Sequence, residues 1–115
     1  MLNIAVRAAR AAGNVITRGF ENRDDLEIQS KGAQDFVTKI DKEAELTIIQ
    51  KIQQSYPDHS FIGEEGGNIK GNDDFTWVID PLDGTSNFIA GIPHFAVSIA
   101  LLFKGKVDQA VVFDP

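Results

Sequence analysis

Residues 77–88 read WVIDPLDGTSNF and give the strongest indication of structure in this chain. Trp77, Val78 and Ile79 form a short apolar run, which predicts a buried strand. Asp80 should stay extended, because a residue before proline is disfavoured in the helical region. Pro81 predicts a turn directly after it. The Asp80 carboxylate is therefore expected at the carboxyl end of a strand.

The residues after this proline have the composition of an anion site. Asp83 stands where a helix N-cap is expected, and Gly84, Thr85 and Ser86 offer backbone N–H groups with small side chains. A short helix beginning there would direct its positive N-terminus at a phosphate. A plain Asp-Gly turn is the alternative, but it explains only two residues of the stretch.

A second acidic cluster, GEEGG at residues 63–67, follows another strand-like run at residues 60–62. Two neighbouring strands could bring both sets of acids to one edge of a sheet. Acids crowded in this way repel each other unless a cation lies among them. Carboxylate oxygens, completed by a carbonyl and water, suit Mg²⁺ or Mn²⁺, which often bind together with a substrate phosphate. The sequence therefore predicts a metal and phosphate site.

Three segments of the sequence, in matching order and spacing, resemble the inositol monophosphatase family, in particular its bacterial members. They are DFVTKID at 35–41, GEE at 63–65 and WVIDPLDGTSNF at 77–88. The resemblance runs through essentially the whole chain. It implies an α+β fold, the layered α-β-α-β-α sandwich of the sugar phosphatases, of which this chain covers about the first half. It also implies Mg²⁺-dependent hydrolysis of myo-inositol 1-phosphate or a similar polyol phosphate.

The resemblance assigns roles to individual positions of this sequence. The metal ligands of the family correspond to Glu64, Asp80, the carbonyl of Leu82, and Asp83. The positions that bind substrate and its phosphate correspond to Glu64, Asp83, Gly84 and Thr85. The catalytic positions of the family correspond to Thr85, Asp41 and Glu64. Of these, Thr85 and Asp41 are implied to orient or deprotonate the attacking water.

Several residues keep a second interpretation. Asp41 is also a good helix start, and both roles can hold together. Glu65 is either a group supporting the metal ligands or a solvated neighbour of them. His59 and His94 are taken as structural, because the predicted site is built from carboxylates and neither histidine has metal-ligand spacing.

The remaining elements follow from periodicity. One apolar face predicts a first helix over residues 3–20, and a second helix is expected from Asp41 to the stop at residues 56–58. Residues 21–34 are polar, with a loop or turn at residues 31–32, and residues 66–74 are expected to be a solvent loop. Residues 96–103 and 107–113 predict an antiparallel hairpin. Helices followed by paired strands indicate a sheet covered by a helix pair.

Composition limits the class of protein. The chain has 115 residues, 43% of them hydrophobic, a net charge of −6 and no cysteine. There is no disulfide framework to assign, and the charge argues against a nucleic-acid-binding face. No apolar stretch is long enough to span a membrane. These features are typical of an ordinary cytoplasmic globular protein, and the small-molecule substrate is what the resemblance implies.

The resemblance also raises the question of completeness. Residues 1–115 are expected to be the N-terminal part of a single domain, because the family takes a further metal-binding Asp and its ring contacts from a C-terminal part absent here. The 115-residue chain alone is therefore expected to be inactive or weak, with a hairpin edge liable to self-association. The family implies a homodimer and lithium sensitivity. The alternative function is a binding module for a protein of the transcription machinery.

Overall fold

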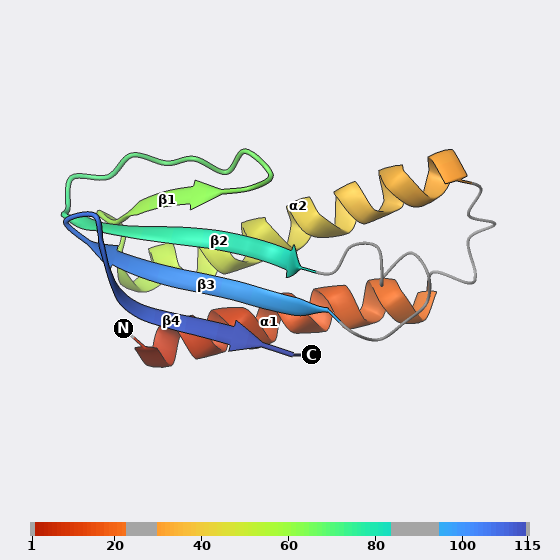
Figure 1. Cartoon of the computed structure of the whole chain (residues 1–115), viewed down its shortest axis with the longest axis horizontal. Helices are drawn as coiled ribbons and strands as arrows, with labels where there is room; N and C mark the ends of the chain where they lie inside the picture. Colours follow the sequence, from red (N-terminus) through yellow and green to blue (C-terminus); the bar gives the residue numbers. More distant parts are fainter. Residues whose placement is uncertain (1, 23–29, 84–94, 115) are drawn as a thin grey trace.

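The computed structural model describes residues 2–22, 30–83 and 95–114. Its helices precede its strands along the chain, as predicted (Figure 1). The elements are α1 (Leu2–Asn22), α2 (Ser30–Ser55), β1 (Ser60–Gly63), β2 (Phe75–Asp83), β3 (Ala96–Phe103) and β4 (Lys106–Phe113). The strands form a sheet in the order β1-β2-β3-β4, in which β1 is parallel to β2 and the other pairs are antiparallel. The predicted α+β class is confirmed.

Both helices pack on the sheet and against each other (Figure 1). α1 lies along β3 and β4, whereas α2 lies along β2. In β3, Val97, Ile99 and Leu101 are fully buried, while the residues between them are only partly covered. This alternation shows that one face of the sheet is the core face. The predicted arrangement of a sheet covered by a helix pair is confirmed.

Small residues allow α1 to approach its neighbours closely. Ala8, Ala9 and Ala12 are completely buried on one face of this helix, at the three- and four-residue spacing of an amphipathic helix. Near its end, a Cβ atom added to Gly19 would lie 2.7 Å from Cδ1 of Ile40 in α2. The two helices therefore pack closely at this point. Within the described ranges, no helix is long and apolar enough to cross a membrane.

The start of α2 differs from the prediction. The helix begins at Ser30, so the loop expected at residues 31–32 and the helix start expected at Asp41 are both wrong. Val37 and Ile40 are buried and extend the 3.6-residue period of the later part of the helix toward its N-terminus. Burial of this face outweighs the local helix-breaking signal of a single glycine. Asp41 consequently lies inside the helix, and α2 ends at Ser55, before Pro57, as predicted.

The predicted C-terminal hairpin is confirmed. β3 and β4 are joined at Lys104 and Gly105, whose φ angles of 49° and 81° are those of a two-residue turn matched to the strand twist. Within the described residues, β4 pairs only with β3 and forms an edge of the sheet. Val107 and Val112 are 70% and 73% exposed there.

His59 is part of the core, between α2 and the sheet. Its ring is 4% exposed and stacks on Tyr56 and Phe75, with centroid separations of 4.7 and 5.0 Å. Its Nδ1 accepts a hydrogen bond of 2.9 Å from Nε1 of Trp77. Burial lowers the pKa of His59, against the opposing effect of Asp73 and Asp58. A neutral imidazole that accepts the indole N–H fits this environment.

We expect Trp77→Phe to destabilise the protein by about 1–3 kcal/mol. The change leaves Nδ1 of His59 buried without a donor, and an unsatisfied buried polar group carries a cost of about that size. Urea denaturation followed by circular dichroism would measure the effect. Val112→Ala, at an exposed position, is the control and should change stability by less than about 0.5 kcal/mol. Equal stabilities for the two variants would show that the His59–Trp77 bond contributes nothing.

Candidate active site

The parallel pairing of β1 and β2 brings the two acidic segments together. Gly63 is the register partner of Ile79, and the Glu64 N–H donates a 3.3 Å hydrogen bond to the Ile79 carbonyl. Glu64 and Asp80 are the next residues along their strands. The expectation that two strands deliver acids to one edge of the sheet is confirmed.

A bulge in β2 follows Asp80. On β3, the partners of Asp80 and Asp83 are Ser98 and Ala96, so three steps along β2 match two steps along β3. The predicted turn at Pro81 is therefore wrong, because β2 continues to Asp83. Proline has no N–H to donate to a neighbouring strand, and a bulge is one of the few strand positions that accept it.

The bulge also determines which way Asp83 faces. As far as Pro81, the buried positions of β2 are alternate residues, Trp77, Ile79 and Pro81. In a regular strand this alternation would place Asp83 on the same core face. Instead Leu82 is buried and Asp83 is exposed. The inserted residue thus puts Asp83 in phase with Asp80, away from the core.

Asp41 approaches the acidic cluster from α2. Its side chain is 7% exposed, and its pKa is raised to about 7, first by burial and then by the negative charges of Glu65, Asp80, Glu64 and Glu45. One carboxylate oxygen, Oδ1, is buried without a hydrogen-bond partner. Glu65 therefore belongs to the charged surroundings of Asp41.

Asp80 is perturbed in the same way. Burial, hydrogen bonding to Glu64 and repulsion from Glu64 and Asp83 raise its pKa to about 6, although the backbone of Leu82 stabilises the carboxylate. Its Oδ1 is also buried and unpartnered. Orphaned buried oxygens are uncommon in proteins and require an explanation. Here the same oxygens face an excess of negative charge.

These residues fit a divalent cation. In the part of the chain that the structure describes, no three or more His, Cys, Asp or Glu side chains are arranged so that they could hold a metal ion as they stand. However, the unpartnered oxygens of Asp41 and Asp80 and the repulsion around them are the conditions that a hard cation relieves. Glu64 and Asp83 adjoin Asp80 and could complete the set. Gly84 and Thr85, together with the predicted short helix, lie outside the described residues.

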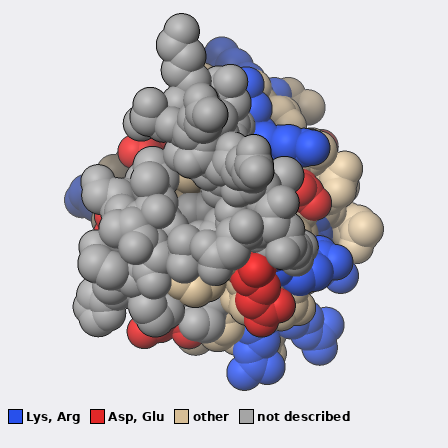
Figure 2. Space-filling model, turned by 90° about the vertical axis from the view of Figure 1, so that its right-hand side faces the viewer, with Lys and Arg blue, Asp and Glu red and all other residues tan. Residues whose placement is uncertain are grey.

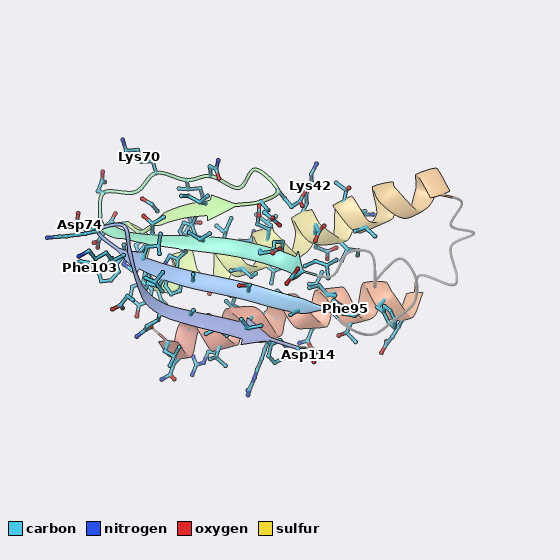
Figure 3. All side chains as sticks on the ribbon, viewed as in Figure 1. Lys42, Lys70, Asp74, Phe95, Phe103 and Asp114 are labelled. Atoms are coloured by element: carbon cyan, nitrogen blue, oxygen red, sulfur yellow. The ribbon has the colours of Figure 1, made fainter. Side chains whose placement is uncertain are left out.

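The surface at this end of the molecule carries both signs of charge. Figure 2 looks toward the end at which β2 stops, and acidic side chains reach the surface there, with Lys and Arg gathered toward one side. In Figure 3, Lys42 projects from α2 near the loop that follows β1, whereas Asp74 and Phe103 lie at the opposite end of the sheet. The coloured charged side chains visible at this end are therefore of both signs.

Sequence reasoning missed Glu45. This residue of α2 is only 3% exposed, and its two carboxylate oxygens accept hydrogen bonds from the N–H groups of Glu65 and Gly67. A signal was present, because Glu45 falls on the same helical face as the buried Ala44 and Ile48. A carboxylate on an apolar face is rarely buried unless it has partners.

Comparison with known proteins identifies the family to which the chain belongs. The model of a family described as the inositol monophosphatase family matches residues 1–115. The chain belongs to the inositol monophosphatase family. Its resemblance to that family, noted from three sequence segments, is thereby confirmed.

Several known proteins are similar over the whole length of this chain. The Nus factor SuhB of Escherichia coli K12 is 59% identical over 116 residues, which cover 100% of this chain and 43% of that protein. The native crystal structure of the suhB protein of Bartonella henselae matches with a TM-score of 0.86 and 39% identity, covering 99% of this chain and 45% of that one. The structure of SaIMPase-II with bound inositol monophosphate has a TM-score of 0.75 and 32% identity, with coverages of 99% and 40%. The chain thus spans less than half the length of these relatives.

Proposed function

We propose that this chain supplies metal-binding and water-activating residues of a Mg²⁺-dependent phosphomonoesterase acting on myo-inositol 1-phosphate or a similar polyol phosphate. The observation that carries the proposal is the convergence of Asp41, Glu64 and Asp80, with buried oxygens of Asp41 and Asp80 left unpartnered. Membership of a phosphatase family supports the reaction class. The inositol monophosphate bound to SaIMPase-II supports the substrate class.

The proposed ligands divide between the two strands. Glu64 would hold Mg²⁺ from the end of β1, and Asp80, the Leu82 carbonyl and Asp83 would hold it from β2. When bound, the metal would lower the pKa of water and stabilise the leaving oxygen. Carboxylates and a carbonyl are hard oxygen donors of the kind that Mg²⁺ prefers.

The other residues would act on the water and the phosphate. Asp41 can orient the attacking water and accept its proton, because its carboxylate adjoins the ligands and lacks a partner at Oδ1. A pKa near neutrality is suited to proton transfer at that pH. We assign Thr85 to the same water through its hydroxyl, and the amides of Gly84 and Thr85 to the phosphate oxygens. Glu64 and Asp83 would also contact the substrate.

Phosphate release from myo-inositol 1-phosphate tests this proposal. We expect turnover with Mg²⁺, its loss when EDTA removes the metal, and its return when Mg²⁺ is restored, because the metal is needed to activate the water and stabilise the leaving oxygen. Fructose 1,6-bisphosphate and phosphoadenosine phosphate serve as comparison substrates and should be hydrolysed more slowly. The assay requires the protein as expressed from its complete gene, because the 115-residue chain alone is proposed to be inactive or weak. Turnover that is insensitive to EDTA would contradict the proposal.

A second candidate function is binding to a protein of the transcription machinery. The observation that favours it is the name Nus factor SuhB, carried by relatives up to 59% identical over the whole of this chain. Such binding would use a protein surface and would not require the carboxylate site. A substitution in the site can therefore separate the two functions.

The remaining parts of the proposal follow from the family. We propose that residues 1–115 are the N-terminal part of one inositol monophosphatase domain, that the protein acts as a homodimer in the cytoplasm, and that lithium inhibits it. The coverage of 43% to 45% of the relatives supports the first of these statements.

A further inference from the structure

Every backbone N–H group of the turn at residues 63–68 donates a hydrogen bond. Each of its N–H groups has an acceptor within 3.3 Å. The acceptors, in chain order, are Oδ1 of Asn68, the carbonyl of Ile79, Oε1 of Glu45, the carbonyl of Gly63, Oε2 of Glu45 and the carbonyl of Gly66. Such a turn has little freedom to change shape without losing bonds.

Glu45 provides the only side-chain acceptors in this set that come from a helix. Its Oε1 accepts from the Glu65 N–H at 3.0 Å, and its Oε2 accepts from the Gly67 N–H at 2.9 Å. The side chain is almost completely buried. Both oxygens of one carboxylate are therefore used, and hydrogen bonds to a charged acceptor are the stronger kind.

The glycines of the turn leave room for this contact. A Cβ atom added to Gly67 would lie 2.6 Å from Oε2 of Glu45 and 2.8 Å from Cδ1 of Ile49, and one added to Gly63 would collide with the same carboxylate. Any larger residue at either position would displace Glu45 or the turn. The glycines of the GEEGG segment thus leave space for the Glu45 carboxylate of α2.

We propose that Glu45 is a positioning residue of the active site, holding the turn so that Glu64 stands beside Asp80. Two hydrogen bonds hold the backbone at Glu64. Its own N–H donates to the Ile79 carbonyl of β2, and the next N–H, of Glu65, donates to Glu45 of α2. This inference rests on the proposed function, because it concerns a ligand of the proposed metal. We assign Glu45 no contact with substrate or metal, because each of its oxygens accepts a hydrogen bond from the turn.

The test is Mg²⁺ binding by isothermal titration calorimetry, with amide hydrogen exchange at residues 65 and 67, in the protein expressed from its complete gene. Glu45→Gln keeps the shape but places an NH₂ group against one of the two N–H donors. We expect the Mg²⁺ dissociation constant to rise about tenfold, as it does when groups that orient metal ligands are lost, and both amides to exchange faster. Glu43→Gln, the same change at an exposed position of α2, should leave both readouts unchanged.

Two further variants separate positioning from charge and from folding. Glu45→Asp keeps the charge but is one methylene shorter, so it should weaken Mg²⁺ binding as Glu45→Gln does; unchanged binding would mean that charge alone matters and would overturn the proposal. Gly67→Ala retains Glu45 and displaces it by contact, which should also raise the dissociation constant. Wild-type affinity in both Glu45→Gln and Gly67→Ala would overturn the proposal. Neither readout requires turnover, so absence of phosphatase activity would refute the proposed function without deciding the role of Glu45.

Discussion

Asp80→Asn should reduce kcat/KM for Mg²⁺-dependent phosphate release by more than about 100-fold. Loss of groups that merely support metal ligands lowers affinity or activity by about 10–100-fold, and Asp80 is proposed as a ligand itself. Its position between Glu64 and Asp83 makes it the centre of the cluster. The amide keeps the size of the side chain but removes the negative charge that a hard cation requires.

Asp74→Asn is the matched control for this experiment. It makes the same chemical change at an exposed residue just before β2, at the opposite end of the sheet from the site (Figure 3). Its activity should stay within about twofold of wild type, because exposed substitutions away from a site have small effects. Equal losses in the two variants would mean that Asp80 has no special role.

The same variant distinguishes the two candidate functions. If a transcription protein binds the surface, Asp80→Asn should retain that binding while turnover is lost, because the mutation neither truncates a side chain nor alters the helices. Co-purification with the transcription machinery from the native cell, compared between wild type and variant, would measure it. Loss of both properties would refute a separate binding role.

The metal-free protein should become less stable as pH rises from about 4 to about 7. Asp41 has an ordinary pKa of 3.8 and a pKa of about 7 in the folded chain. Below pH 4 both states are protonated, and between these values the unfolded state loses its proton first, so ionisation favours unfolding. Since one pKa unit corresponds to about 1.4 kcal/mol, the upper limit for Asp41 is about 4 kcal/mol. The raised pKa of Asp80 acts in the same direction.

Urea denaturation at several pH values, with and without Mg²⁺, would measure this effect. A cation that binds only the folded state stabilises it by about 2.7 kcal/mol at 100 times its dissociation constant. The stabilisation by Mg²⁺ should be larger at pH 7 than at pH 5, where protons compete for the carboxylates. A metal-free stability that is flat or rises between pH 4 and 7 would contradict the assignment.

Asp41→Asn should remove most of this pH dependence. The neutral amide avoids the burial of a charge among four other acids, so the metal-free variant should be more stable than wild type at pH 8, by up to about 4 kcal/mol. It should also lose activity, because the amide cannot accept a proton from water. Asp108→Asn, at an exposed position of β4, should change neither property.

The strands and their acids could be predicted because their signals are local. Apolar runs that end in Glu64 and Asp80 indicated two strands, and parallel pairing then places both acids together. The hairpin turn at residues 104–105 was likewise encoded by a short segment. Membership of the inositol monophosphatase family depended on three such segments in register.

The features that sequence reasoning missed depend on contacts between distant segments. The start of α2 is determined by burial of Val37 and Ile40, which a local glycine signal obscured. Glu45 acquires its role only when residues 65 and 67 fold over it, some twenty positions later. The bulge after Asp80 depends on the register of β3, which no property of β2 alone reveals.

Because of the bulge, the number of residues between Asp80 and Asp83 matters to the site. Asp80 and Asp83 share an outward orientation only because β2 contains one residue more than the facing stretch of β3. Deleting Leu82 would reduce the spacing of the two acids to two residues, which places both on one face of a regular strand, but it would also remove the backbone carbonyl proposed as a metal ligand. Straightening the bulge while both residues between the aspartates are kept would instead turn Asp83 toward the core, so the three-residue spacing and the bulge are needed together.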